Sequence, residues 1–477
     1  MPPSTLLRNI YKSGYAKQRC IVLIPSIILG PYSQQFLHGL RYYEERYLYF
    51  LAYLKNPNTR LVAVLTEGVE PALLDYFYDH IKKAVGITAQ DIRERFQIIW
   101  VKAVKGKTLT QNILHNKKLI QKIRDAVPNK KDASIEFWRV TNDELSLAKK
   151  LAIPYYGLNK SAFSVNTKSG ARQLFQQCRI SIPKGYHCVS LPDVHRKLQK
   201  LLTVSPAKSF LVKLNDEGGG VGIIRLAREA CQQSYTVFVK QFPLPKEESL
   251  SLFQQYFKKE GGVVEEFIEP HVIASPSVQF EIFPDGSIQD LSTHDQIIDG
   301  VDYLGTRFPA NEDYRKQIIA AGRTVTKEIK KMGGQGFIAM DLLVTKENEK
   351  HKIWGIEINA RKGGANHTNM WAVLLTGARY NIKRGILESD KGDVYYRASE
   401  YFINQPWLKK ISPRQLLNVI HKEGLDFNAK TKEGVFVHLL SPLPHFGKFG
   451  VTVIAHSQDD VERYWKRLED TIKIIPR

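Results

Sequence analysis

The sequence predicts a protein that combines an α/β fold with an α+β fold in three consecutive segments. Apolar strands and helices alternate up to about residue 156, antiparallel hairpins and a glycine-rich turn follow, and a last strand pair and helix close the chain. We therefore expect an α/β domain over 1–156, a second domain over 157–395 and a small C-terminal segment over 396–477. The length of 477 residues agrees with about three domains.

The first segment has the pattern of a doubly wound parallel sheet. Its strands are continuous apolar runs, as expected where helices cover both faces of a parallel sheet. The sequence also predicts an aromatic, amphipathic helix over 39–54 and a helix over 71–84 with Pro71 in its first turn. No glycine-rich turn follows the first strand, so a dinucleotide site is not expected there. The predicted strands are 19–24, 61–65, 96–101 and 135–140.

The second and third segments show the pattern of antiparallel strands with fewer helices. A helix begins after 167–170 and ends near Cys178, another covers 323–332, and Pro284, Asp285 and Gly286 mark a hairpin turn. The strands expected in the second segment are 210–214, 223–226, 263–268, 277–282, 287–292, 336–344 and 353–358. In the third segment we expect strands 434–440 and 449–455 and a closing helix 458–472.

The composition describes a globular protein with an excess of positive charge. Lys and Arg number 69 against 48 Asp and Glu, a net charge of +21, which points to an anionic partner such as a nucleotide, nucleic acid, membrane surface or acidic peptide. No apolar run approaches the roughly 18 residues that span a bilayer, so no membrane association is expected. The four cysteines form no CxxC pair, which favours the reducing cytoplasm over a disulfide framework.

A lysine followed by a glycine-rich loop predicts a phosphate-binding element. Lys213 lies on a predicted strand, and four glycines follow it before the next strand. Glycine backbone lets amide N–H groups approach phosphate oxygens closely, and the ammonium group offsets their charge. Because the glycines lie between two strands, we interpret the loop as a hairpin lid over a nucleotide; an ordinary glycine-rich β-turn is the alternative. The four residues are Gly218, Gly219, Gly220 and Gly222.

Acidic and amide side chains on two neighbouring strands predict a magnesium site. Glu357, Asn359 and Arg361 alternate with apolar residues and so share one face of a strand, and Asp341 joins them if its strand pairs with theirs. Two carboxylates and an amide oxygen are hard ligands that suit Mg²⁺ bridging nucleotide phosphates. Arg361 could neutralise charge on a transferring phosphoryl group. A solvated strand face is the alternative interpretation.

Two further polar runs give weaker indications of ligand-binding residues. Glu265, Glu266 and Ile268 belong to the end of a predicted strand, where a carboxylate and adjacent backbone groups could read the edge of an adenine. His294 and Asp295 lie in a dense polar run after another strand. Contact with a substrate is one interpretation of this run, and a structural histidine is the other.

Taken in order, these elements resemble the ATP-grasp superfamily of carboxylate–amine ligases. The resemblance implies a two-lobed ATP-grasp fold over 157–395, preceded by a doubly wound pre-ATP-grasp domain. The positions that match the superfamily are Lys168 and Lys213 for its two nucleotide lysines, Glu265 to Ile268 for the adenine-binding strand and hinge, Asp341, Glu357 and Asn359 for the Mg²⁺ ligands, and Arg361 for the last residue of an E-x-N-x-R pattern of the biotin carboxylase-like branch.

A closer resemblance is to the pheganomycin-type peptide ligases, which also place a pre-ATP-grasp domain before the ATP-grasp domain. The similarity extends from about residue 20 to 457. It rests on the motifs at 25–26, 43–46, 275–279, 292–296, 308–310 and 357–364.

The resemblance implies an enzyme that uses ATP and Mg²⁺. ATP would phosphorylate a small-molecule carboxylic acid to an acylphosphate, and an amine or peptide would then displace phosphate, with His294 or Asp295 assisting the incoming amine. An ATP-grasp small-molecule kinase without ligation and a non-catalytic nucleic-acid-binding protein are the alternatives. No nucleic acid is expected as a partner, because the sequence shows no nucleic-acid module and no long Lys/Arg run. The oligomeric state, a homo-oligomer included, stays open.

Overall fold

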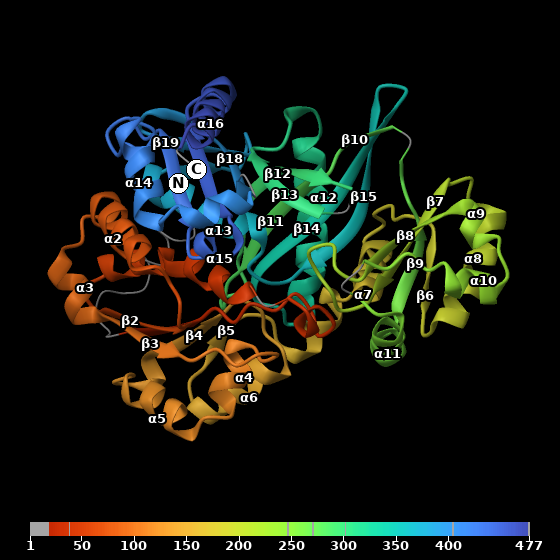
Figure 1. Ribbon diagram of the computed structural model, residues 1–477, viewed down its shortest axis with the longest axis horizontal. Helices are drawn as coiled ribbons and strands as arrows, with labels where there is room; N and C mark the ends of the chain where they lie inside the picture. Colours follow the sequence, from red (N-terminus) through yellow and green to blue (C-terminus); the bar gives the residue numbers. More distant parts are fainter. Residues whose placement is uncertain are drawn as a thin grey trace.

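The computed structural model describes residues 19–37, 39–245, 248–269, 271–300, 302–402 and 405–475. Within these ranges the strands form a five-stranded, a four-stranded and an 11-stranded sheet. The first sheet lies in the N-terminal part, the second forms a lobe at the opposite end, and the third lies between them (Figure 1). This mixed α/β and α+β architecture confirms the fold class that the sequence predicts.

The N-terminal sheet has the order β3-β2-β1-β4-β5, and every neighbouring pair is parallel. Side chains that point to one face, such as Ile21 and Leu23, belong to a different hydrophobic cluster from Val22 and Ile24 on the other face. Both faces are therefore buried, as the continuous apolar strands predict. The strands are β1 (Arg19–Ile24), β2 (Thr59–Thr66), β3 (Phe96–Val101), β4 (Ala133–Phe137) and β5 (Tyr155–Tyr156).

Helices cover the N-terminal sheet on its two faces (Figure 1). Over one face lie η2 (Leu40–Lys55), α2 (Pro71–Val85) and α3 (Ala89–Arg95). Over the other lie α4 (Leu109–Leu114), α5 (Lys117–Asp125) and α6 (Asn142–Leu151). The short helices are η1 (Ser33–Gln35), η3 (Lys130–Asp132) and η4 (Lys160–Asn166).

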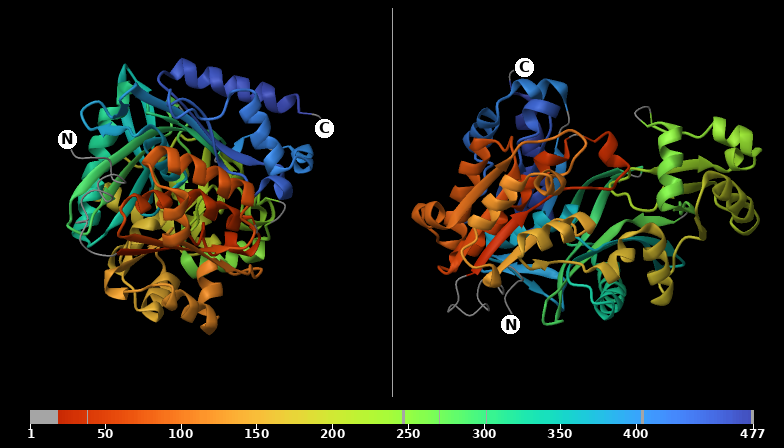
Figure 2. Two further views of the ribbon diagram at one scale, coloured as in Figure 1. Left: turned by 90° about the vertical axis from the view of Figure 1, so that its left-hand side faces the viewer. Right: turned by 90° about the horizontal axis from the view of Figure 1, so that it is seen from below.

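The four-stranded sheet is antiparallel, with the order β6-β9-β7-β8. Together with its helices it forms a lobe that projects from the rest of the molecule (Figure 2). Its strands are β6 (Gly185–Cys188), β7 (Ser209–Leu214), β8 (Ile223–Ala227) and β9 (Gly262–Glu266). Its helices are α8 (Leu191–Val204), α9 (Arg228–Cys231), α10 (Tyr235–Lys240) and α11 (Leu250–Glu260), and α7 (Lys168–Gln177) precedes them.

The large sheet is built around the pair β14 and β15, which lies beside β11, β12 and β13. Apolar residues of α12 share a hydrophobic cluster with β11 and β14, whereas α13 packs with the N-terminal helices. The strands are β10 (Val272–Ala274), β11 (Pro276–Ile282), β12 (Ile288–Asp299), β13 (Asp302–Phe308), β14 (Gly336–Glu347), β15 (Lys350–Asn359), β16 (Arg379–Asn381), β17 (Ile386–Ser389) and β18 (Gly392–Phe402). The helices are α12 (Glu312–Lys331) and α13 (Gly364–Thr376).

The last part of the chain completes the large sheet. The predicted strand pair is present as β19 and β20, and β20 also pairs with β18, so the C-terminal strands extend the sheet of the preceding segment. No helix in the described ranges is long and apolar enough to cross a membrane. The elements are η5 (Pro406–Lys410), α14 (Pro413–Lys422), β19 (Gly434–Leu439), α15 (Leu443–Phe446), β20 (Phe449–Ala455) and α16 (Gln458–Lys473).

The helix expected over 39–54 differs from its prediction in type and in burial. It is a 3-10 helix, η2, and most of its residues are buried, so it is not amphipathic. It packs between the N-terminal sheet and α13, and it also contacts β19. Partners therefore surround it on several sides, which removes the exposed face that the sequence pattern indicated.

Three successive charged residues of η2 are buried, and each holds a different part of the chain. The Glu44 carboxylate accepts hydrogen bonds from the Thr66 amide at 2.6 Å and hydroxyl at 2.8 Å, at the end of β2. A 3-10 helix has about three residues per turn, so successive side chains point in three directions. Glu45 accepts the amides of Leu440 and Ser441 in the C-terminal part, and Arg46 forms an ion pair with Glu400 of β18.

The burial of Glu44 predicts a dependence of stability on pH. Burial raises the pKa of this carboxyl from 4.5 to about 8. Its contribution to stability is therefore complete below pH 4.5 and is lost as the pH rises through 8. We expect wild type to lose free energy of unfolding relative to Glu44→Gln across this interval, as measured by urea denaturation. The exposed Glu67→Gln variant should follow wild type, and parallel curves for wild type and Glu44→Gln would contradict the prediction.

Candidate active site

Two adjoining cavities lie where the N-terminal domain, the lobe and the large sheet meet. The first, which we call the central pocket, has a volume of about 200 Å³ and is lined by residues of all three parts. The second, the lid pocket, has a volume of about 180 Å³ and lies between the lobe and the large sheet. Five residues line both cavities, which places the junction of the two pockets at Gly219, Gln296, Tyr303, Asp341 and Glu357.

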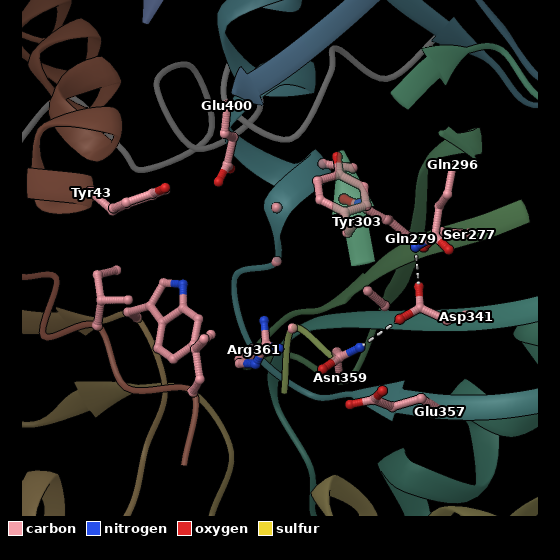
Figure 3. Close-up of a pocket in the computed structure, with 18 of the residues that line it drawn as sticks. Tyr43, Ser277, Gln279, Gln296, Tyr303, Asp341, Glu357, Asn359, Arg361 and Glu400 are labelled. Carbon is pink, nitrogen blue, oxygen red and sulfur yellow. Dashed lines mark hydrogen bonds between the residues drawn. The ribbon is translucent and has the colours of Figure 1, made fainter. Parts of the chain in front are cut away.

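The expected acidic cluster is formed at this junction. Asp341 in β14 and Glu357 in β15 are direct partners in the strand pairing. The Asn359 amide nitrogen donates to one oxygen of Asp341 at 2.9 Å, and the Gln296 amide nitrogen donates to the other at 2.9 Å (Figure 3). The structure thus brings together the predicted set of Asp341, Glu357 and Asn359 and orients the Asp341 carboxylate.

The pKa values of the two carboxylates, Asp341 and Glu357, are shifted in opposite directions. Burial, and then the neighbouring charge of Glu357, raise the pKa of Asp341. Burial also opposes ionisation of Glu357, but the Lys168 ammonium group, 2.7 Å from its carboxylate, acts together with Arg361 and Lys213 to lower the Glu357 pKa. Lys168, at the start of α7, is itself 4% exposed, whereas Glu357 is half-buried.

The second predicted lysine lies in the lid pocket. Lys213 on β7 is 2.5 Å from the Glu265 carboxylate on the neighbouring strand β9, and Arg172 of α7 reaches the other oxygen of Glu265. Burial alone would raise the pKa of Glu265, but these two cations lower it. The three side chains together carry one net positive charge, and Lys213 and Glu265 line the pocket.

This arrangement corrects the expectation for the adenine-reading carboxylates. Glu265 is held between two cations, and Glu266 accepts the Lys184 amide at 2.9 Å and the Ser205 hydroxyl at 2.6 Å. Both carboxylates are therefore engaged with the protein. β9 ends at Glu266, so Ile268 lies beyond the strand rather than within it, and it lines the lid pocket.

The glycine-rich loop folds over the junction of the pockets. Gly219, Gly220 and Gly222 have positive φ angles of 66°, 84° and 70°, conformations that glycine adopts at little cost. Gly219 lines both pockets, and a Cβ atom on Gly218 would come within 3.3 Å of the Arg361 guanidinium. The positive φ angles favour glycine at three positions of the loop, and the loop lies against the site at Gly219, in agreement with a lid.

The lid is fastened to the N-terminal domain by Glu217. Its carboxylate accepts the Tyr32 amide at 2.6 Å and the Ser33 amide at 3.2 Å, and Glu217 is 4% exposed. Burial raises the pKa of Glu217 to about 7, although the hydrogen bonds oppose this rise. Asp216 adds an ion pair with Arg139, which follows β4. Nothing in the sequence pattern indicated these contacts, because the two segments are far apart in the chain.

Arg361 is the cation that faces the central pocket from the end of β15. Its guanidinium lies 4.5 Å from the centre of the Trp138 ring, a cation–π contact that orients it (Figure 3 shows Arg361 beside Asn359 and Glu357). The next residue, Lys362, is buried and binds Glu136 and the Phe137 carbonyl of β4. The N-terminal sheet thus positions the strand end that carries Arg361.

His294 and Asp295 do not reach either pocket, which corrects their expected contact with an incoming amine. His294 is fully buried, its Nε2 is 2.6 Å from the Tyr396 hydroxyl, and burial lowers its pKa to about 3. Asp295 accepts the Tyr314 hydroxyl at 2.7 Å from helix α12. Gln296, the next residue, lines both pockets instead.

The central pocket also contains residues that the sequence did not identify as a site. Arg46 and Glu400 form a buried ion pair on its wall. Tyr43 and Tyr303 line the same pocket, and Figure 3 shows them together with Glu400. A run of charges within an aromatic helix was a usable signal for Arg46, because such residues are buried only when paired. Glu400 lies in an ordinary strand, 354 residues away, and carries no comparable signal.

Family models match two parts of the chain. The model described as IQCH-like, ATP-grasp matches residues 230–383, and that of the PGM1 C-terminal domain matches residues 415–468. The chain contains an ATP-grasp domain. This domain carries Glu265, Asp341 and Glu357 within the matched range.

A relative of known activity is similar to this chain over most of its length. The L-propargylglycine–L-glutamate ligase of Streptantibioticus cattleyicolor is 28% identical over 433 residues, which cover 89% of this chain and 88% of that enzyme. The resemblance to the pheganomycin-type peptide ligases is thereby confirmed.

Solved structures of ATP-grasp enzymes share the fold. Biotin carboxylase from Campylobacter jejuni superposes with a TM-score of 0.57 at 13% identity and covers 95% of this chain and 91% of its own. N5-carboxyaminoimidazole synthetase from Staphylococcus aureus, complexed with ADP, gives 0.54 at 12% identity and covers 95% of this chain and 97% of its own.

The contacts of Glu217 predict that the lid and the N-terminal segment open together. A hydrogen bond to a charged group contributes about 1.5–3 kcal/mol, so Glu217→Ala should speed amide exchange at Tyr32 and Ser33 roughly ten-fold or more. Hydrogen–deuterium exchange with peptide-level mass spectrometry measures this directly. Glu229→Ala, at an exposed position of the same lobe, is the matched control. Unchanged exchange over 31–36 in the Glu217 variant would show that the contact does not hold the lid.

Proposed function

We propose that this chain is an ATP-dependent ligase. It joins the carboxylate of an amino acid or derivative to the amine of an amino acid or peptide through an acylphosphate, and it releases ADP and phosphate. The observation that carries the proposal is the position of the half-buried carboxylates Asp341 and Glu357 next to Lys168, where the central pocket joins the lid pocket with Lys213. The relationship to an amino-acid ligase supports the same reaction class.

We assign the nucleotide to the lid pocket. Leu211, Ile223 and Leu342 give this pocket apolar surface for a base, and Lys213 and the glycine-rich loop offer an ammonium group and backbone amides for phosphates. Because the carboxylates of Glu265 and Glu266 are engaged, backbone groups between Glu266 and Ile268 would read the edge of the base. Lys168, ion-paired with Glu357, is the second lysine for the phosphates.

The donor set at the junction fits a magnesium ion. Two half-buried carboxylates, Asp341 and Glu357, face each other across the strand pair. Removal from water and then the repulsion between them raise the pKa of Asp341, and a divalent cation would relieve this repulsion. Asp341, Glu357 and the side-chain oxygen of Asn359 would hold the ion. When bound there, Mg²⁺ would offset the negative charge of the nucleotide phosphates.

The residues of the chain position the reactants and balance charge, as is usual in phosphoryl transfer. A carboxylate oxygen of the acid attacks the γ-phosphorus of ATP, ADP leaves, and an acylphosphate results. The amine nitrogen then attacks the acyl carbon, the bond from that carbon to the phosphate oxygen breaks, and the nitrogen gives a proton to the departing phosphate. Arg361 stabilises negative charge in both steps, and the lid excludes water that would hydrolyse the acylphosphate.

The central pocket supports an amino acid as the acid substrate. Arg46 and Glu400 present one positive and one negative group on the same wall, with the hydroxyl-bearing rings of Tyr43 and Tyr303 beside them. Such a pair complements the ammonium and carboxylate groups of an amino acid. The name of the Streptantibioticus cattleyicolor relative likewise includes two amino acids, L-propargylglycine and L-glutamate.

Trapping with hydroxylamine separates a ligase from an ATP-grasp kinase that uses the same nucleotide site. A screen of ADP release over amino acids and short peptides, acidic ones included, first identifies the acid. Hydroxylamine should then give a hydroxamate that requires both ATP and this acid, because it intercepts the acylphosphate. A stable phosphorylated product with no hydroxamate would favour the kinase.

The carboxylate assigned to the metal gives a second prediction. Glu357→Gln removes one charge from the junction and should lower ADP release by roughly a hundred-fold or more, while the urea unfolding curve stays cooperative. Glu347→Gln, at an exposed position of β14, is the matched control and should turn over normally. Near-normal ADP release by the Glu357 variant would refute the assignment.

A further inference from the structure

A third cavity, which we call the basic pocket, opens in the N-terminal domain. It has a volume of about 470 Å³, larger than either pocket of the candidate active site. It lies at the carboxyl ends of β1, β2 and β3, where residues that follow β1 and β3 line it together with Thr66, the last residue of β2. This edge of an open parallel sheet is the place where such sheets bind ligands.

Three cations line the basic pocket. Arg41, Lys105 and Lys107 are exposed, and none of them is ion-paired within the part of the chain that the structure describes. Glu44 is the one acidic residue in the lining, and its carboxyl is bound to Thr66. Since burial raises the pKa of Glu44 to about 8, this carboxyl is largely neutral at pH 7 and leaves the three positive charges uncompensated.

The segment that carries the two lysines is tied to the wall of the pocket. The Gln34 side-chain nitrogen donates to the Gly106 carbonyl at 2.8 Å, and the Lys107 amide closes a turn on the Val104 carbonyl at 3.1 Å. Gly106 has a φ of 72°, which suits this turn. The lysines are thus held on a defined turn beside Gln34.

The pocket also presents an unsatisfied polar group. Asn112 is 9% exposed, lines the cavity, and its side-chain oxygen lacks a hydrogen-bond partner among the described residues. A buried acceptor without a donor is costly, so a ligand N–H group that filled this role would bind favourably. The lining therefore complements a molecule that carries both carboxylates and N–H groups.

The basic pocket adjoins the central pocket. Ile27 and Leu40 line both cavities, so these two apolar side chains lie where the basic pocket and the proposed acid site meet. A ligand that occupies the basic pocket could extend one end past these residues. In peptide ligation the acceptor reacts through its amino end, and the opposite end of any peptide acceptor carries a carboxylate.

We propose that the basic pocket binds the carboxylate-bearing end of the amine substrate, a short acidic peptide whose amino end extends past Ile27 and Leu40 into the central pocket. Arg41, Lys105 and Lys107 bind its carboxylates, and Asn112 accepts a backbone N–H. The inference rests on the proposed ligase function, because it places the second substrate of that reaction.

Binding of a defined probe tests the pocket separately from catalysis. We would titrate the tripeptide Glu-Glu-Glu, and the C-terminally amidated Gln-Gln-Gln, which carries no carboxylate, into the full chain with a non-hydrolysable ATP analogue by calorimetry. Lys105→Glu/Lys107→Glu should weaken binding of Glu-Glu-Glu by roughly ten-fold or more, because two attractive charges become repulsive. Lys117→Glu/Lys118→Glu makes the same charge change at exposed positions of α5 outside the pocket and should stay within about two-fold of wild type.

Three outcomes overturn the proposal: no binding of Glu-Glu-Glu to wild type, equal weakening in the two double variants, or equal affinity for Glu-Glu-Glu and amidated Gln-Gln-Gln. Hydroxylamine trapping distinguishes this failure from failure of the ligase function. Hydroxylamine does not need the basic pocket, so Lys105→Glu/Lys107→Glu should form hydroxamate at the wild-type rate. If the wild-type protein forms no hydroxamate, the ligase reaction is rejected, whatever the peptide binding shows.

Discussion

The buried side chains of Glu44, Glu45 and Arg46 in η2 are the constraint on which the assembly of the molecule depends. Glu44 binds the end of β2, Glu45 binds the C-terminal part, and Arg46 binds β18. A buried charge without its partner is strongly destabilising, so these parts must come together in one arrangement. The same arrangement places Arg46 and Glu400 on the wall of the central pocket, so the contacts that join the parts also shape the site.

In the candidate site, too, charged side chains are held by specific partners. Lys168 is paired with Glu357, Lys213 and Arg172 share Glu265, and the Arg361 guanidinium lies over Trp138. These contacts restrict the motion of long side chains. The cationic groups are therefore already in position to hold phosphate and carboxylate charges. The lid is also held in place, because Glu217 attaches it to the N-terminal domain, which supplies Trp138.

Local patterns in the sequence predicted the sheets and the acidic cluster well. Asp341, Glu357 and Asn359 were predictable because alternation and the pairing of adjacent strands determine which side chains share a face. Alternation does not reveal what covers that face, and His294 lies beneath Tyr396 and α13 rather than in a pocket. The buried state of η2 and the partner of Arg46 depend on residues hundreds of positions away, and no local pattern encodes them.

Each member of the ion pair between Lys168 and Glu357 can exchange its partner for a bound ion with the same charge as that partner. If the ammonium group turns to a phosphate, the Glu357 carboxylate loses its counter-ion in a half-buried position and requires another cation. An incoming anion and an incoming cation therefore each make the other's binding more favourable, and the coupling is reciprocal by thermodynamic necessity. A polyanion that arrives already complexed with a divalent metal satisfies both halves of the exchange in a single event.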